Sequence, residues 1–222
     1  MECPPSDTRT ALLHAALASF AESGFDGTSI RMIAERAQRP LSLLAHHFGN
    51  KEGLYLEVFK FIFEQKACND ALSSIPSEGC TPKDRDEALD LLRQQLRNLF
   101  QDVSERSVNS DPVHELGGRL WLQEIRAPRP SLAPIFDIYI RPLTETIRKC
   151  IQTLRPDLEE EAVTFLGISI LGQIVGHGLM RGLNEMVWPK TEQAECHPHA
   201  SQWLLDLCLN GLLGSPVHRP EP

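Results

Sequence analysis

Apolar residues recur every three or four positions along most of this 222-residue chain. The first such stretch holds Leu13, Ala16, Leu17 and Phe20, a spacing that places side chains on one face of an α-helix. No stretch shows the sustained two-residue alternation that a half-buried β-strand needs. The pattern therefore predicts an all-α fold, and the 41% share of hydrophobic residues supplies enough apolar material for a sizeable core.

Capping and helix-breaking residues predict four helices in the N-terminal quarter, at about residues 7–23, 28–39, 40–47 and 50–62. Gly24 supplies the stop of the first helix. Thr28 and Asn50 are natural N-caps, and Pro40 suits the first position of the short third helix. Because a tight turn joins the second and third helices, the segment is a predicted helix-turn-helix, in which the last helix enters the major groove of DNA.

Helical periodicity resumes after a loop-like segment and predicts further helices at about residues 89–100, 112–124, 131–154, 158–186 and 199–213. Pro142 should kink or interrupt the helix that contains it. We expect a DNA-binding domain at residues 1–55, a helical ligand-binding and dimerisation domain at residues 56–214, and a disordered tail at residues 215–222.

The charge of the chain is unevenly distributed. Its formal net charge is -8, which argues against non-specific coating of nucleic acid or anionic lipid. The 24 residues from 28 to 51 nevertheless carry four basic side chains (Arg31, Arg36, Arg39 and Lys51) against one acidic side chain, Glu35. This local excess of positive charge favours DNA as the partner of the helix-turn-helix.

Three short motifs follow one another in this segment: the Gly-Phe turn at Gly24, the run Thr-Ser-Ile-Arg-Met-Ile-Ala from Thr28, and His-Phe-Gly-Asn-Lys-Glu-Gly-Leu from His47. Together they resemble the DNA-binding domain of the tetracycline-repressor (TetR) family. The resemblance implies a homodimer that binds a pseudo-palindromic operator and represses transcription. It also implies that a small-molecule effector, bound in the larger helical domain, releases the DNA by shifting the two recognition helices relative to each other. The six widely spaced cysteines, with no C-x-x-C pair among them, predict a reducing cytoplasm.

The resemblance assigns DNA contacts to the second and third helices and to the start of the fourth. The candidates are Thr28, Ser29, Arg31, Leu41, Ser42, Leu43, His46, His47 and Lys51. The chain departs from the family pattern at Gln38, where a turn glycine is usual, and at Ala45, where a phosphate-contacting tyrosine is frequent. Since Ser42 is the only hydrogen-bond donor among side chains 40–45, we expect Leu41 or Leu43 to contact thymine methyl groups.

The larger domain resembles, more weakly, the C-terminal domain of a TetR subgroup of the CecR type. Along the predicted helix 158–186, polar side chains recur every four residues at Ser169, Gln173, His177 and Arg181. This polar line fits the wall of a pocket for a polar or anionic effector, but it also fits a helix side that faces solvent or a dimer partner. The candidate effector contacts are Trp121, Gln173, His177 and Arg181.

Close helix approach is permitted by the glycines of the 158–186 helix, which suits a dimer interface with the helix at 199–213. In that last helix, Trp203 and Leu207 offer apolar surface.

Other classes of function have less support in the residues. The sequence contains no G-x-S-x-G, H-E-x-x-H, P-loop or G-x-G-x-x-G pattern, so we predict neither an enzyme nor a cofactor. Cys196, His197 and His199 form a cluster that motivates a metal- or redox-responsive regulator as the alternative, although their spacing is not a standard zinc pattern and we assign no metal. The apolar run at residues 162–180 carries Gln173 and His177, so we read it as a buried helix and expect no membrane partner.

Overall fold

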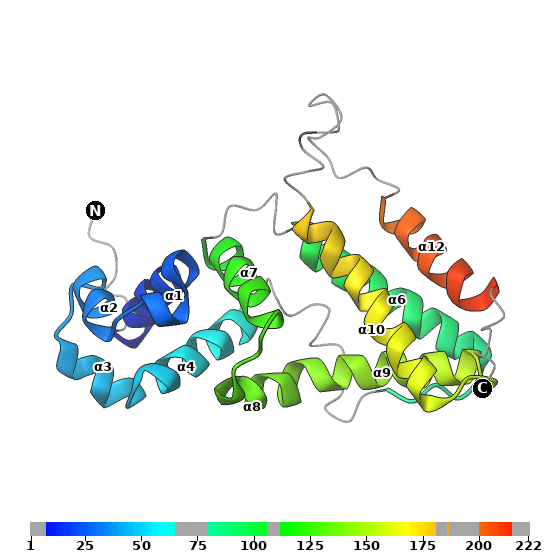
Figure 1. Ribbon diagram of the computed structural model, residues 1–222, viewed down its shortest axis with the longest axis horizontal. Coiled ribbons are helices and arrows are strands. Elements are labelled where there is room, and N and C mark those ends of the chain that lie inside the picture. Colours follow the sequence, from blue (N-terminus) through cyan, green and yellow to red (C-terminus); the bar gives the residue numbers. More distant parts are fainter. Residues whose placement is uncertain (1–7, 65–79, 106–111, 181–185, 187–199, 215–222) are drawn as a thin grey trace, which may run out of the picture. The chain divides into compact units, whose positions relative to one another are not determined.

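The computed structural model describes residues 8–64, 80–105, 112–180, 186 and 200–214, and every regular element within these ranges is a helix (Figure 1). This confirms the all-α prediction. The chain forms two compact units, one of residues 1–69 and 109–139, the other of residues 70–108 and 140–222. The predicted boundary at residue 55 falls inside a helix, and the assignment of functions to residues 1–55 and 56–214 stays a prediction.

The first unit contains the N-terminal helices and a later segment that returns to them. Its elements are α1 (Thr8–Gly27), α2 (Ile30–Arg36), α3 (Leu41–Phe48), α4 (Lys51–Glu64), α7 (Pro112–Ile125), η2 (Pro130–Leu132), α8 (Ala133–Ile135) and η3 (Phe136–Ile140). Helix α1 packs on α2, α4 and α7. The apolar stripe predicted from the sequence is the core of this unit, because Leu13, Ala16, Leu17 and Phe20 are all buried.

Two glycines set the ends of these helices. Gly24 has a φ of 69° and breaks the helical path of α1, which confirms the predicted stop. At Gly53, in the first turn of α4, a Cβ atom would collide with the carbonyl oxygen of Phe48 at the end of α3. Only glycine therefore lets α3 and α4 approach so closely.

The N-caps agree only partly with the sequence prediction. Asn50 caps α4, since its Oδ1 accepts a 2.8 Å hydrogen bond from the Gly53 N–H. The prediction of Thr28 as the cap of α2 is wrong, because the N-cap is Ser29, whose Oγ accepts from the Met32 N–H at 3.2 Å. Pro40 lies one position earlier than predicted, at the N-cap of α3.

The turn between α2 and α3 is a Schellman motif. The Arg39 N–H donates to the Ala34 carbonyl and the Gln38 N–H donates to the Glu35 carbonyl, both at 3.0 Å. Such a motif needs a left-handed residue after the helix, and Gln38 fills this place with a φ of 53°. The departure from glycine noted in the sequence therefore falls at the position where glycine has least strain.

The predicted helix 131–154 is interrupted, as Pro142 indicated. The chain forms the short elements η2 and α8 and then the π-helical η3, before α9 (Arg141–Leu154) begins with Pro142 in its first turn.

The second unit is built on α6 (Arg85–Glu105), which contacts α9, α10 (Glu160–Leu179) and α12 (Ala200–Gly214). Its core contains Leu92, Leu96, Ile147 and Ile174. Two arginines cap helix ends: Arg85 donates to the Leu154 carbonyl at 2.7 Å, and Arg155 donates to the Leu212 carbonyl at 2.8 Å. Among the helices described, including α10, none has the length and apolar character that a membrane span requires.

Candidate functional site

The helix-turn-helix presents most of the predicted DNA-contacting side chains to solvent. Six of the nine are exposed: Ser29, Arg31, Leu41, Ser42, His46 and His47. On the opposite side of α3, Leu44 and Phe48 are buried in the core of the first unit. The recognition helix is therefore fixed by one face and leaves the other available, which is the arrangement that groove binding requires.

Thr28 differs from the other candidates. Its side chain is buried, and its hydroxyl lies 3.0 Å from the Ser19 carbonyl oxygen and 2.7 Å from that of Gly24. Its backbone N–H donates to the Phe25 carbonyl at 3.2 Å. The hydroxyl and the backbone N–H of Thr28 thus both donate to carbonyl groups of α1, which leaves neither donor for a DNA phosphate.

The positive charges of this unit are not equally available. Arg36 donates two hydrogen bonds of 2.6 Å to the carboxylate of Glu22 on α1, and this contact lowers the pKa of Glu22. Arg31 is exposed and has no charged partner among the residues the structure describes. Arg31 is therefore better placed than Arg36 for an anionic partner.

Lys51, at the start of α4, is held on an aromatic ring. Its Nζ lies 4.2 Å from the ring centroid of Phe25, and the Arg129 guanidinium carbon lies 4.5 Å from the same centroid. Arg129 also donates to the Asp26 carboxylate at 2.9 Å. The segment after α7 therefore touches the same turn that positions Lys51.

A buried carboxylate anchors this segment. Glu124, on α7, accepts hydrogen bonds from the Tyr55 hydroxyl at 2.8 Å and from the Arg129 N–H at 2.6 Å. Burial and the contact with Glu124 both raise the pKa of Tyr55, because each penalises a phenolate there. Helices α1, α4 and α7 are thus joined by one polar network within the first unit.

The predicted effector residues are not brought together as a single site. Trp121 belongs to the first unit, where its ring contacts those of Phe59, Phe63 and Phe136. Gln173 and His177 lie on α10 in the second unit. Arg181 lies outside the described residues.

Gln173 and His177 each contact another helix of the second unit. The thiol of Cys208, on α12, donates to the Gln173 amide oxygen at 3.2 Å. The His177 ring lies 5.3 Å from that of Phe100, on α6. Gln173 is nevertheless exposed and His177 is half-buried, so both interpretations of the polar line on α10, as a pocket wall or as a side that faces solvent or a partner, stay open.

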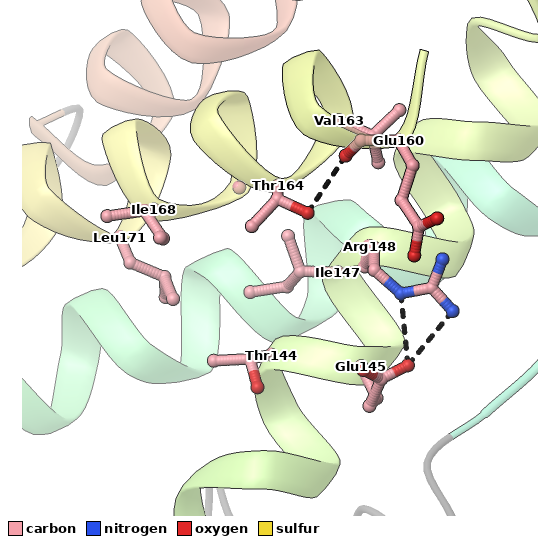
Figure 2. A pocket seen from close by; sticks show the side chains of 10 residues that line it. Thr144, Glu145, Ile147, Arg148, Glu160, Val163, Thr164, Ile168 and Leu171 are labelled. Atoms are coloured by element: carbon pink, nitrogen blue, oxygen red, sulfur yellow. Dashed lines mark hydrogen bonds and ion pairs between the residues drawn. The ribbon is translucent and has the colours of Figure 1, made fainter. Parts of the chain in front are cut away.

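A pocket of about 380 Å³ opens between α9 and α10 (Figure 2). Arg148 donates to Glu145 at 3.1 Å inside it, and Figure 2 shows the guanidinium between the carboxylates of Glu145 and Glu160. Of the predicted effector residues that the structure describes, none lines this pocket.

The described residues do not test the cysteine and metal alternative. Cys196, His197 and His199 lie outside them, and the described part of the chain contains no group of His, Cys, Asp and Glu side chains that could hold a metal ion. Burial raises the pKa of the Cys150 thiol to about 12, which disfavours the reactive thiolate there.

Gln95 is a buried polar residue that is not among the predicted site residues. It is 2% exposed, in the core-facing stripe of α6, and its Oε1 accepts no hydrogen bond from the described residues. The signal was available in the sequence, since Gln95 lies three residues after Leu92 and four before Leu99 and so interrupts an apolar stripe.

Comparison with known families decides the class of protein. A model described as bacterial regulatory proteins of the tetR family matches residues 12–58. A second model, the C-terminal domain of the HTH-type transcriptional dual regulator CecR, matches residues 92–212, more than half of the chain. The chain belongs to the TetR family of transcriptional regulators. TetR-family members are DNA-binding regulators and not enzymes, in agreement with the prediction from the missing catalytic motifs.

Characterised TetR relatives match parts of the chain. It is 36% identical over 52 residues to the HTH-type transcriptional repressor AcnR of Corynebacterium glutamicum, covering 23% of this chain and 28% of the relative. It is 26% identical over 120 residues to the HTH-type transcriptional regulator BetI of Burkholderia thailandensis, covering 54% of this chain and 56% of the relative. The chain thus spans about half or less of these relatives.

Solved structures share the TetR fold over nearly the whole chain. A TetR-like regulator from Rhodococcus sp. RHA1 superposes with a TM-score of 0.61 at 18% identity, covering 96% of this chain and all of that one. HlyIIR, a hemolysin II transcriptional regulator, superposes with a TM-score of 0.57 at 19% identity, covering 90% and 96% of the two chains. At these identities the likeness concerns the fold.

Proposed function

We propose that this TetR-family regulator is a homodimeric repressor that binds a pseudo-palindromic operator and is released from it by a small-molecule effector. The observation that carries the proposal is the two-sided character of α3, which buries Leu44 and Phe48 and exposes Leu41, Ser42 and His46. A regulator that acts on DNA works beside the chromosome, so a cytoplasmic location belongs to the same proposal.

The proposed contact residues divide into two kinds. Arg31, His47 and Lys51 provide positive or donor groups for phosphates, which position the protein without reading sequence. Ser42 can hydrogen-bond a base edge, and Leu41 can contact a thymine methyl group. We leave the Thr28 side chain out of this interface because its hydroxyl is used inside the unit.

Ser29, Leu43 and His46 complete the proposed interface. The Ser29 oxygen accepts the Met32 N–H, which leaves its hydroxyl proton for a phosphate. Leu43 is half-buried, so Leu41 is the better placed of the two leucines for the floor of the groove.

Dimerisation is supported by an apolar surface on α10 and α12, which contact each other in the second unit. Phe165 and Ile168 on α10 are 69% and 63% exposed, and Trp203 and Leu207 on α12 are 53% and 64% exposed. Each pair is spaced three or four residues apart and so shares a helix face. Large exposed apolar side chains on neighbouring helices favour association with a second copy.

The effector is assigned to the second unit on weaker grounds. Gln173 and His177 are polar groups on a mainly apolar helix, and each contacts a side chain of a neighbouring helix. Arg181 and Trp121 remain predicted contacts. A ligand that binds one arrangement of the dimer more tightly than the DNA-bound arrangement would lower operator affinity.

The DNA-binding part is tested by fluorescence anisotropy with fragments that flank the protein's own gene, titrated at several salt concentrations. Replacing Arg31 and Lys51 together by alanine should weaken binding and reduce the log–log salt slope by about 4, since each lost phosphate contact removes about 1 and the dimer loses two contacts in each subunit. Arg97→Ala, an exposed arginine in the second unit, is the matched control and should bind as the wild type does. Unchanged affinity and slope in the double variant would refute the assigned interface.

A further inference from the structure

Gln95 is the one buried polar side chain of the second unit, within its described residues, whose oxygen has no hydrogen-bond partner. The other buried polar residue there, Thr146, is satisfied, because its hydroxyl donates to the Pro142 carbonyl at 2.8 Å and accepts from the Cys80 N–H at 2.9 Å. Gln95 therefore stands apart as an acceptor without a donor in the core.

This arrangement is costly for stability. An amide taken out of water without a replacement hydrogen bond destabilises the fold, whereas an apolar side chain of the same size would stabilise it. Leu92 and Leu99, on the same stripe of α6, show which side chains the surroundings favour. An unpaired acceptor that lowers the stability of the fold in this way points to a hydrogen-bond donor supplied by another molecule.

Gln95 lies where several helices of the second unit meet. Helix α6 contacts α9, α10 and α12, so its core-facing stripe lies at the centre of the second unit. Five residues further along α6, Phe100 packs against the half-buried His177 of α10, one of the predicted effector residues. Among the described residues of this unit no charged side chain is buried, so the surroundings disfavour a charged ligand.

We propose that Gln95 is the hydrogen-bonding contact of an effector site in the core of the second unit, and that this site takes a mainly apolar, uncharged molecule with one O–H or N–H donor. An alcohol, a phenol or a neutral amide meets this description. The inference rests on the proposed function, because it names the ligand class of the effector-binding unit.

Benzyl alcohol and phenol are suitable probes, with toluene as their donor-free counterpart. The side-chain amide signals of Gln95 are identified in a ¹H–¹⁵N spectrum of the full-length protein as those missing from Gln95→Met. Benzyl alcohol and phenol should shift these signals and bind about fivefold more tightly than toluene, the gain expected of one hydrogen bond. In Gln95→Met, which keeps the volume of the side chain, this preference should disappear. Gln94→Met, at an exposed position on the same helix, should keep it.

The unliganded proteins provide a second readout. Gln95→Met should raise Tm by roughly 3–8 °C, because it removes an unpaired buried acceptor. A lower Tm would show that the amide has a structural partner and would overturn the proposal. If neither benzyl alcohol nor phenol shifts the NMR signals of the Gln95 amide, the proposal is also overturned. The same holds if wild type and Gln95→Met prefer these two probes over toluene to the same degree. None of these results depends on DNA, so failure of operator binding in the anisotropy assay would refute the proposed function separately.

Discussion

The phenolic hydroxyl of Tyr55, on α4, donates a 2.8 Å hydrogen bond to the buried carboxylate of Glu124, on α7. The two residues lie 69 positions apart in the sequence, and both belong to the first unit. Since Arg129 contacts Glu124, Asp26 and the ring of Phe25, this bond belongs to the network that supports the turn beneath Lys51. The DNA-binding helices are thus stabilised by a segment from far along the chain.

Removing the Tyr55 hydroxyl should destabilise this unit. Tyr55→Phe leaves the buried carboxylate of Glu124 with one donor fewer, which should lower the free energy of unfolding by about 1.5–3 kcal/mol. Urea denaturation measures the change. Tyr139→Phe, at the half-buried second tyrosine, is the control and should cost less. Equal losses in the two variants would contradict a special role of the bond to Glu124.

Alkaline pH should act on the same group. The folded state raises the pKa of Tyr55, so between the unfolded and folded pKa values the folded state holds a proton that the unfolded state has released. The contribution to stability is complete below about pH 10, the ordinary tyrosine value, and is lost as the pH rises above it. Unfolding free energies measured from pH 8 to 11 should therefore fall more steeply for the wild type than for Tyr55→Phe. Equal pH dependence of the unfolding free energy in the two proteins would contradict a raised pKa of Tyr55 in the folded state.

Replacing the left-handed residue of the α2–α3 turn by glycine should stabilise the protein. Gln38→Gly removes the strain of a φ of 53° and keeps the Schellman hydrogen bonds, so the unfolding free energy should rise by about 0.5–1 kcal/mol. Gln94→Gly, in the exposed middle of α6, should instead lose about 1 kcal/mol. A loss of stability in Gln38→Gly would show that the turn does not hold this conformation in solution.

Contact between Leu41 and thymine should be visible in the DNA. Replacing operator thymines by uracil removes only the methyl group, and the wild type should lose about two- to fivefold in affinity at a contacted thymine, the value of roughly one buried methyl group. Leu41→Ala should bind the two DNAs equally. If the uracil substitution lowers the operator affinity of Leu41→Ala as much as that of the wild type, another residue contacts the thymine methyl group.

Dimerisation through α10 and α12 can be tested without DNA. Phe165→Asp places a charge in the exposed apolar surface, and light scattering after size exclusion should show a shift from dimer to monomer. Glu161→Gln, at an exposed position on the same helix, should leave the mass unchanged. A wild type that is already monomeric, or a Phe165→Asp variant that is still fully dimeric, would contradict the proposed interface.

Features set by local chemistry could be predicted from the sequence. Gly24, Asn50 and Pro142 act through their own backbone or side chain, and the structure confirms the stop, the cap and the interruption expected of them. Thr28 and Ser29 could not be told apart in this way, because either hydroxyl can cap a helix. The contact of Thr28 with the Ser19 carbonyl, nine residues away, makes the choice.

Features set by long-range packing were beyond the sequence pattern. Trp121 and Gln173 were both predicted as effector contacts, whereas the fold assigns them to different compact units. The apolar stripe of α6 indicates that Gln95 faces the core, and the structure adds that its side-chain oxygen has no hydrogen-bond partner among the described residues.

The central claim is that a dimer of this chain binds a symmetric operator through the exposed side of α3. Hydroxyl-radical footprinting on the DNA upstream of its own gene tests this claim most directly. We expect two protected half-sites related by two-fold symmetry and separated by about 10 base pairs or a multiple of that spacing, with both lost together in the Arg31→Ala, Lys51→Ala variant. Absence of protection, or a single half-site protected equally by wild type and variant, would contradict the claim.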